Sequence, residues 1–404
     1  MSLLDDIEVQ MARGDIDVPK EAFKNRVSMF VNRIIHPVGQ GAFYSEKIHI
    51  NNQSFNIVYD CGSNTSYKVN GKKKVVQTEV RSYYHKEETI NLLFISHFDN
   101  DHVNGLEYLK DHCNIKCVIM PLLTPSAKWF YLSQLDENLQ QLITDPQVFF
   151  GEGTKIIRVK YTNGEKTERD ELVLNNNEPI HKNEIVSGTI IQFRNLQDWC
   201  YIPFNFDEES RYEKLIDALK GSSLDTDALL QGDIDYIKEH RTAINNAYKK
   251  VVKSRNSNDS SLIVYSGPTY TGHSFYRKYN FKFGYCRTSP RLSLKEVACL
   301  YLGDTNLNQK SEKMNLCHAL SYHLNNVKEN IGLIQVPHHG SKHNFNDDIL
   351  FISEGACAYF ASFGRRNHFG HPSYRVVEDI EMHGSFVGIT EDRDSAFIDV
   401  IYKR

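Results

Sequence analysis

The chain has 404 residues, of which 40% are apolar and 24% are charged, and its formal net charge at pH 7 is −4. This composition is ordinary for a globular chain that folds as one large domain with insertions or as two or three smaller domains. The net charge argues against strong nonspecific binding to duplex nucleic acid, so a nucleic-acid partner would be a short single strand or a small nucleotide that meets a local basic patch.

Neither the cysteines nor the N-terminus indicates export or membrane insertion. Eight cysteines are scattered without a CxxC pair, which favours buried free thiols in a reducing compartment over a disulfide framework. Residues 1–6 contain no basic segment followed by an apolar one, and no apolar run approaches the ~18 residues needed to span a bilayer. We therefore expect a cytoplasmic protein with no membrane partner.

The first part of the chain predicts a polar extension followed by β-structure. Residues 1–28 are polar with a weak apolar stripe and are expected to form an N-terminal helical extension. Apolar runs over 30–38, 43–50 and 55–59, separated by turn residues, predict a β-meander. The order of a βαβ unit follows, with a strand over 91–95, a helix over 103–110 and a strand over 117–120.

The middle of the chain interrupts this pattern. Residues 124–255 contain helix-like segments and are predicted to form an inserted helical or cap region, which would offer a surface to a protein partner. Alternating elements then return, with strands over 262–265, 297–302, 331–336, 356–363 and 396–402 and helices over 316–327 and 374–382. We therefore expect one α/β domain built from residues 29–123 and 256–404.

A dense group of potential metal ligands follows the strand over 91–95. The segment His97-Phe98-Asp99-Asn100-Asp101-His102 holds two histidines and two aspartates within six residues. A loop at the end of a buried strand can turn such side chains toward one point, and imidazole with carboxylate suits zinc, manganese or iron(II). A solvated turn rich in aspartate and histidine is the simpler alternative, but H-x-D-x-D-H directly after an apolar strand favours a metal site.

Three later segments also place polar residues shortly after predicted strands. They hold Asp304, the adjacent pair His338 and His339, and His371. Each has a plain alternative, since Asp304 could cap a helix and the histidines could lie in surface turns. Function often lies at the carboxyl ends of strands in layered α/β folds, so four such clusters on one chain favour a shared site.

In this order the motifs resemble the metallo-β-lactamase superfamily, and within it the hydrolase domain of the DNA-uptake protein ComEC and its soluble relatives. That subgroup carries H-x-D-x-D-H where the superfamily more often has H-x-H-x-D-H, and Asp99 stands at the changed position. Further matching motifs are Val38-Gly39-Gln40-Gly41, Asn258 to Leu262, Gly303-Asp304, Val336 to Ser341 and Gly370-His371-Pro372. The resemblance covers roughly residues 30–123 and 258–403.

The resemblance implies an α/β fold of the αββα sandwich type, with a metal site at one edge between two sheets and, in this chain, an inserted mainly helical subdomain. It also implies one or two divalent metal ions, zinc or manganese. The implied ligands are His97 and Asp99 at a first position, Asp101 and His102 at a second, Asp304 as the bridge, and His338 completing the second position. His339 would then be a proton donor, unless the two adjacent histidines exchange these roles.

One departure concerns the first metal position. The superfamily usually has a further histidine between the first cluster and the bridging aspartate. His112, His181, His240 and His273 lie in this interval, but none stands in a matching context. The first metal position is therefore expected to be weak, and occupancy by one metal or by two stays open.

The resulting prediction is a metal-dependent hydrolase, best interpreted as a phosphodiesterase or nuclease that uses a metal-activated water. Asp101 would orient or deprotonate this water, and His339 or His371 would stabilise developing charge or protonate the leaving group. Arg365 and Arg366 lie close to His371 in the sequence and would bind phosphate. The alternatives are hydrolysis of a small ester, lactone or nucleotide, and a regulatory or effector subunit of a multi-protein system that retains the fold.

Overall fold

The structure is a computed structural model that describes most of the chain. The described residues are 28–65, 68–69, 72–73, 75–162, 170–175, 180–206, 219–220, 224–231, 233–251, 261–272, 275–281, 294–308, 315–354 and 357–403. The predicted N-terminal helical extension lies outside the described residues except for residue 28.

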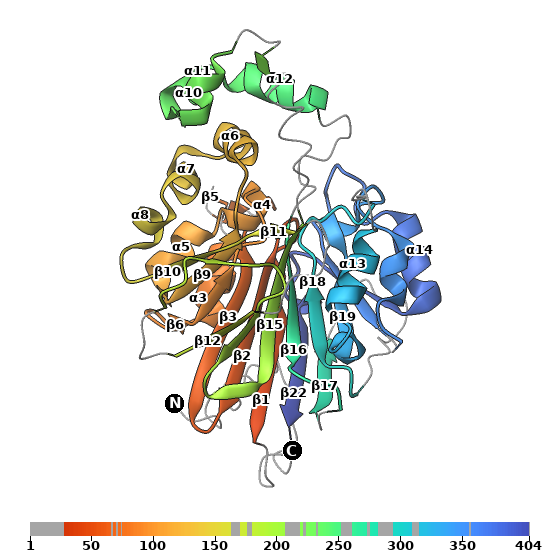
Figure 1. Cartoon of the computed structure of the whole chain (residues 1–404). Helices are drawn as coiled ribbons and strands as arrows, with labels where there is room; N and C mark the ends of the chain where they lie inside the picture. Colours follow the sequence, from red (N-terminus) through yellow and green to blue (C-terminus); the bar gives the residue numbers. More distant parts are fainter. Residues whose placement is uncertain are drawn as a thin grey trace.

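Two large mixed sheets face each other at the centre of the molecule, and helices cover both outer faces (Figure 1). The first sheet has the order β13 (Glu184–Ile185), β10 (Lys155–Val159), β9 (Cys117–Pro121), β7 (Leu92–Phe94), β3 (Gln53–Cys61), β2 (Phe43–Ile50), β1 (Met29–Ile35), β22 (Phe397–Lys403) and β17 (Phe275–Phe281). The second has the order β12 (Glu171–Leu174), β14 (Ile190–Phe193), β15 (Leu196–Phe206), β16 (Leu262–Pro268), β18 (Ala298–Tyr301), β19 (Ile331–Gln335), β20 (Ala358–Ser362) and β21 (Ser385–Ile389), with β11 (Tyr161–Thr162) paired to β15. The predicted αββα sandwich is confirmed.

The helices divide between the two outer faces (Figure 1). Those beside the first sheet are α3 (Val75–Tyr83), α5 (Leu106–His112), α6 (Pro125–Gln134), α7 (Glu137–Thr144) and α8 (Pro146–Phe150). Those beside the second sheet are α13 (Leu316–His323) and α14 (Tyr374–His383). A further group lies beyond α6, at the top of Figure 1, and consists of α10 (Thr226–Gln231), α11 (Ile234–Glu239) and α12 (Arg241–Val251). Short pairs are formed by β4 (Lys68–Val69) with β5 (Lys72–Lys73) and by β6 (Thr89–Ile90) with β8 (Asn114–Ile115).

The opening β-meander shows how the sequence produces these layers. In β3, Phe55, Ile57 and Tyr59 point into the core between the sheets, whereas Val58 and Cys61 belong to the core beneath the outer helices. Successive side chains on a strand point to opposite faces, so an apolar run without polar alternation suits a strand that is covered on both sides. β2 pairs antiparallel with β3 on one side and with β1 on the other, as the meander predicts.

The middle of the chain differs from its prediction as a mainly helical insertion over 124–255. Its helices α6–α8 and α10–α12 are present, but between them β10 and β13 extend the first sheet. In the same interval β12, β14 and β15 extend the second sheet. Nearly all of β15 is buried, and an apolar run buried on both faces lacks the alternation that distinguishes a strand from a buried helix. The sandwich therefore includes the strands from β10 to β15.

A group of buried charges lies between the two sheets and is called here the inter-sheet ion cluster. It consists of Arg33 on β1, Glu46 on β2, Arg277 on β17 and Asp399 on β22. Arg33 Nε lies 2.7 Å from Glu46 Oε1 and Arg33 Nη1 lies 2.8 Å from Asp399 Oδ2. Arg277 Nε lies 2.8 Å from Asp399 Oδ1, at ion-pair distance but without hydrogen-bond alignment. The cluster ties the edge of one sheet together from within the core.

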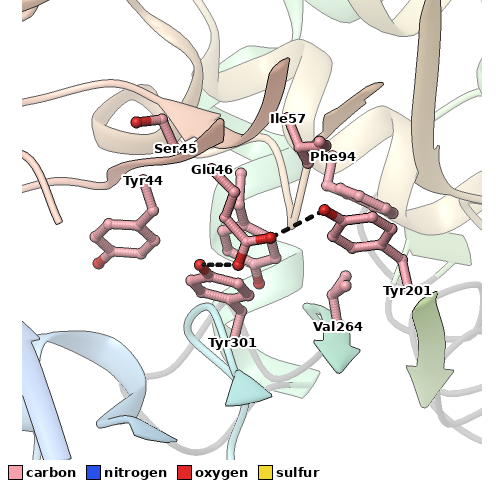
Figure 2. Close-up of a pocket in the computed structure, with 9 residues that line it drawn as sticks. Tyr44, Ser45, Glu46, Ile57, Phe94, Tyr201, Val264 and Tyr301 are labelled. Carbon is pink, nitrogen blue, oxygen red and sulfur yellow. Dashed lines mark hydrogen bonds between the residues drawn. The ribbon is translucent and has the colours of Figure 1, made fainter. Parts of the chain in front are cut away.

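Hydroxyl groups complete the surroundings of Glu46. Figure 2 shows its carboxylate between the phenol groups of Tyr301 and Tyr201, which donate hydrogen bonds of 3.0 and 2.9 Å. Ser266 donates to the same carboxylate. The two tyrosines belong to the second sheet, so these bonds join the sheets across the core.

The described helices and cysteines bear on the expectations about membrane insertion and disulfides. None of the described helices is long and apolar enough to cross a membrane. The cysteines within the described ranges are buried free thiols, which agrees with the expectation from their spacing.

Candidate metal centre

The candidate ligands lie where several strands end at one edge of the sandwich. His97 lies between β7 and the short helix α4 (Asn100–Val103), and Asp101 lies in that helix. Asp304 follows β18, and the pair His338 and His339 follows β19. β18, β19 and β20 are parallel neighbours, so their carboxyl ends meet at one edge of the second sheet.

Two histidines have their Nδ1 atoms fixed by oxygen atoms that can only accept hydrogen bonds. Nδ1 of His339 donates to the carbonyl oxygen of Ser362 at 2.7 Å. Nδ1 of His102 donates to Asp60 Oδ2 at 2.8 Å. A carbonyl or ionised carboxylate oxygen has no proton to give, so Nδ1 carries the proton in both rings and a neutral ring keeps its lone pair on Nε2. Histidine ligands of metals use this arrangement.

His97 is fixed in the same way through a serine. The hydroxyl of Ser96 donates to Asp60 Oδ2 at 2.6 Å, so its oxygen accepts from Nδ1 of His97 at 2.9 Å. Across the described residues, Nε2 of His97 and Nε2 of His102 are buried without a hydrogen-bond partner. Two buried nitrogen atoms without partners are costly in a folded protein unless another group satisfies them.

These nitrogen atoms converge on two carboxylates. Nε2 of His102 lies 3.2 Å from Asp304 Oδ1, and Nε2 of His97 lies 3.7 Å from Asp304 Oδ2. Nε2 of His339 lies 3.2 Å from Asp101 Oδ2. Two sets of ligand atoms result, each within 4.8 Å: His97 with His102 and Asp304, and Asp101 with His102 and His339.

The spacing of these atoms fits a divalent metal ion. Zinc binds histidine and carboxylate at ~2.0–2.2 Å in tetrahedral geometry, which places neighbouring ligand atoms about 3.3 Å apart. The observed separations of 3.2 and 3.7 Å around Asp304 are close to this value. Together with the two nitrogen atoms that lack partners, the donor set fits the metal that the sequence predicts.

His338 and His339 point to different parts of the site. His339 is 4% exposed and faces Asp101. The side chain of His338 is 22% exposed, and its Nε2 lies 3.7 Å from Asp304 Oδ2. His338 was predicted to join Asp101 and His102, whereas in the structure His339 is the histidine grouped with them, as in the alternative order. Both residues have a left-handed backbone, with φ of 48° and 56°, and such strain is often concentrated at functional sites.

Burial and neighbouring charges set the protonation of the site. Burial, reinforced by His102, lowers the pKa of His97 to about 3, so this ring is neutral at pH 7. Burial also opposes charge on His102, but Asp304 and Asp60 outweigh it and raise the pKa of His102 well above its ordinary value. The pKa of Asp304 lies well below its ordinary value, because the surrounding histidines outweigh the effect of burial. Asp304 is therefore an anion inside the protein.

The remaining predicted ligand, Asp99, lies at the outer side of the first set. Its Oδ2 is 4.0 Å from Nε2 of His97. The histidines of the interval before Asp304 do not fill the gap in this set. His112 and His240 instead bond backbone carbonyls at 3.0 Å, His181 is exposed, and His273 lies outside the described residues.

His371 lies at the rim of the site. Its ring centroid is 5.7 Å from that of His338, in an edge-to-face contact. Burial, followed by the nearby histidines His338 and His339, lowers the pKa of His371 to about 4, so its ring is neutral at pH 7. It touches the cluster without belonging to either ligand set.

The two predicted phosphate-binding arginines differ in their partners. Arg365 Nη1 lies 2.8 Å from Asp392 Oδ2, and its Nε lies 3.6 Å from Glu391 Oε1. Arg366 is exposed and forms no ion pair with any described residue. Because its charge is already paired, Arg365 is the weaker candidate for phosphate binding, and Arg366 is the stronger.

The sequence analysis missed the carboxylate that orients two of the histidines. Asp60 is completely buried, lies one residue before the end of β3, and has a left-handed φ of 56°. β3 and β7 are parallel neighbours, so Asp60 lies beside the start of the H-x-D-x-D-H segment. The available signal was a charged residue at the end of an apolar strand, directly before Cys61-Gly62.

Comparisons with known proteins bear on this fold. Residues 49–178, which include the H-x-D-x-D-H segment, match the family model of the metallo-beta-lactamase superfamily. No curated protein sequence matches the chain. The crystal structure of unliganded yeast PDE1 is similar at 8% identity and a TM-score of 0.38, over 94% of this chain and 100% of that chain. A likeness this distant carries no argument about function.

The family match and the sandwich agree with each other. The matched region supplies β3, β7 and β9 of the first sheet together with the first group of candidate ligands. The donor set fits a divalent ion, which supports a metal-dependent hydrolase. The chain therefore resembles the metallo-β-lactamase superfamily in its sandwich fold, in its candidate ligands and, over residues 49–178, in its sequence.

Proposed function

We propose that the chain is a phosphodiesterase or nuclease of the ComEC-like kind that uses one or two divalent metal ions, zinc or manganese. The observation that carries the proposal is the convergence of three imidazole Nε2 atoms, each on a ring with a fixed Nδ1, toward Asp101 and Asp304. The two ligand sets share His102. The two sets therefore lie side by side, which suits two adjacent ions, the arrangement that stabilises both the attacking and the leaving oxygen of a phosphodiester.

The residues divide between two metal positions. Asp101, His102, His339 and Asp304 would hold the second ion. His97, Asp99 and Asp304 would hold the first ion, with His338 as a further ligand. His338 suits this position because its Nε2 and that of His97 lie 3.7 Å from the same oxygen of Asp304. His338 would thus replace the histidine that the superfamily usually places earlier in the chain.

Bound divalent ions supply an activated water and neutralise charge on the phosphate. The chain's own groups would then orient the water and assist the departure of the leaving oxygen. The pKa of Asp101 is lowered because its hydrogen bond to His339 and the charge of His102 outweigh burial, so this carboxylate is an anion that can accept a proton from water. His371 would donate a hydrogen bond to the leaving oxygen. Arg366 would bind a neighbouring phosphate.

The experiment combines metal analysis with a substrate panel. Purified protein would be analysed for metal and assayed with Mn²⁺ or Zn²⁺ on single-stranded DNA, duplex DNA, RNA and methyl 4-nitrophenyl phosphate, with and without chelator. We expect cleavage that the chelator abolishes. Asp101→Ala and His102→Ala should lose this activity, whereas the control His383→Ala, at the exposed end of α14, should keep it.

Two results would contradict the proposal. Metal-loaded protein that leaves all four phosphodiesters intact is not a phosphodiesterase, and cleavage of an ester or lactone instead would identify the alternative hydrolase. Folded His102→Ala protein with full activity and full metal content would show that the ligand assignment is wrong. Circular dichroism on each variant separates loss of the site from loss of the fold.

A further inference from the structure

An exposed aromatic ring stands beside the candidate metal centre. It belongs to Phe369, in the segment 364–373 between β20 and α14, called here the rim loop. Phe369 is 71% exposed. A single exposed apolar side chain is ordinary on a protein surface, so exposure alone does not indicate a function for Phe369. The hydrogen bonds of the rim loop and the groups near the ring provide the argument.

Hydrogen bonds from one side chain organise the rim loop. Nδ2 of Asn367 donates to the carbonyl oxygens of Gly364 and His371, both at 2.7 Å. Oδ1 of Asn367 accepts from the backbone N–H groups of Phe369 at 3.2 Å and His371 at 3.1 Å. Four bonds from one amide group close the loop on itself, so Phe369 projects from an ordered backbone.

The rim loop is also fastened to the turn that carries the metal-site histidines. The backbone N–H of Ser373 donates to the carbonyl oxygen of Gly340 at 2.9 Å. A side chain at Gly340 would lie 2.6 Å from Cβ of Pro372, so the two segments touch closely. Gly340 directly follows His338 and His339, and the position of Phe369 is therefore tied to that of the site.

A continuous series of ring contacts runs from the surface to the ligands. The ring of Phe369 lies nearly parallel to that of His371, with centroids 5.9 Å apart and an interplanar angle of 15°. His371 in turn contacts His338 edge-on at 5.7 Å. The other side of the loop is open, because a Cβ added at Gly370 would meet no atom within 4 Å. A flat group can therefore reach Phe369 while its phosphate reaches the metal centre.

We propose that Phe369 is a stacking platform for an unpaired nucleobase next to the scissile phosphodiester. This inference rests on the proposed function and narrows its substrate to nucleoside phosphodiesters, as single strands or small nucleotides. Every base has a π-face, and stacking on an aromatic side chain needs no particular base. Arg366 in the same loop is exposed without an ion pair among the described residues and adds positive charge for the backbone. Bases inside a duplex are already stacked and cannot use the platform.

The test compares two substrates with the same leaving group. Thymidine 5′-(4-nitrophenyl phosphate) carries a base, and methyl 4-nitrophenyl phosphate does not. With metal-loaded full-length protein, Phe369→Ala should lower kcat/KM about tenfold for the first and leave the second unchanged. Phe369→Trp should keep the activity, and Phe369→Leu, which is apolar but not aromatic, should behave like Phe369→Ala.

The chain offers a matched control. Phe351 is also an exposed phenylalanine beside a histidine, 67% exposed with its ring 5.2 Å from His383. Phe351→Ala should leave both substrates unchanged. A loss in Phe369→Ala that is equal for both substrates, or no loss at all, would overturn the inference while leaving the proposed function intact.

A binding measurement separates the inference from the proposed function. Titration calorimetry with thymidine 5′-monophosphate should give a Kd about tenfold weaker for Phe369→Ala than for the unchanged protein or Phe351→Ala. If neither nitrophenyl ester is cleaved but this difference in Kd is found, the proposed phosphodiesterase fails and the base-binding platform stands. If Kd is the same in all three proteins, the platform is refuted whatever the activity.

Discussion

Two buried polar clusters lie within one sandwich, and they differ in how their charges are balanced. In the inter-sheet ion cluster, Arg33 lies within 2.8 Å of both Glu46 and Asp399, and Arg277 lies 2.8 Å from Asp399. Two guanidinium groups thus match two carboxylates. Buried charges are tolerated when opposite charges are paired in this way, so this cluster needs no bound cation to balance its carboxylates.

The candidate metal centre has no such balance. The ion-pair partners of Asp60, Asp101 and Asp304 are histidines, and no lysine or arginine of the described ranges forms an ion pair with them. The Nδ1 protons of these histidines are held in hydrogen bonds that point away from the centre of the cluster. The Nε2 atoms of His97 and His102 are buried without a hydrogen-bond partner. The comparison teaches that one cluster balances its carboxylates with guanidinium groups of the chain itself, whereas the other has only titratable histidines around its carboxylates and could hold a cation.

The largest effect is expected from removing the charge at the centre of the unbalanced cluster. Asp304 is within 3.7 Å of three imidazole Nε2 atoms, so Asp304→Asn should lose bound metal and lower activity by about 10³-fold or more, since metal ions supply several kcal/mol of transition-state stabilisation. The fold should survive because Ser261 and Asn344 hold the backbone of Asp304. Mass spectrometry for metals and steady-state kinetics measure the two losses. Full metal content in this variant would show that Asp304 is not the bridge.

The balanced cluster should respond in the opposite way. Arg33→Met leaves Glu46 without its guanidinium partner inside the core and removes one of the two partners of Asp399, and breaking a buried pair costs about 3–5 kcal/mol of unfolding free energy. Metal content per folded molecule should not change. Urea unfolding gives the free energy, and Arg393→Met, whose side chain is 72% exposed, is the control and should change it by less than about 1 kcal/mol. If Arg33→Met also lowered the unfolding free energy by less than about 1 kcal/mol, the inter-sheet ion cluster would not be essential to the stability of the fold.

Metal addition should stabilise the protein, and more strongly at higher pH. The folded-state pKa values of His102 and His339 are raised because nearby carboxylates outweigh burial. Their protonation therefore stabilises metal-free protein below the ordinary histidine pKa, and this contribution is lost as pH rises through the raised values. Metal requires the unprotonated rings, so its contribution grows over the same range, to about 2.7 kcal/mol at 100 times Kd.

Thermal unfolding with and without Zn²⁺ at pH 6 and pH 8 measures this difference. The increase in Tm should be larger at pH 8. Asp304→Asn should show no metal-dependent increase at either pH. An equal increase in both proteins would mean that zinc binds elsewhere.

The sequence predicts the parts of this molecule whose signals are local. The strand over 43–50 has the same bounds in the structure, and the ligands that follow β7, β18 and β19 could be found because polar residues after apolar strands are visible in one dimension. β15 was missed because a strand buried on both faces carries no alternation, and β12 and β14 because a strand of 4 residues is too short to give a clear pattern. α3 was missed because its paired valines lie in a polar stretch that resembles a loop. The different directions in which His338 and His339 point depend on two left-handed φ angles that the pair of adjacent histidines does not reveal.

Asp60 was not predicted because its role depends on its contact with a neighbouring strand, which the sequence does not reveal. Its substitution is expected to give the smallest and most specific effect. Asp60 accepts hydrogen bonds from Nδ1 of His102 and from Ser96, which in turn fixes His97, without entering either ligand set. Asp60→Asn should weaken metal affinity by about 10–100-fold, as loss of a carboxylate behind a histidine ligand does. Activity at saturating metal should fall less than affinity, because the ligands themselves remain. Metal titration against a chelator gives Kd, and kinetics at saturating metal give the remaining activity. Unchanged affinity would mean that His102 and His97 hold their orientation without Asp60, and that packing alone sets the site.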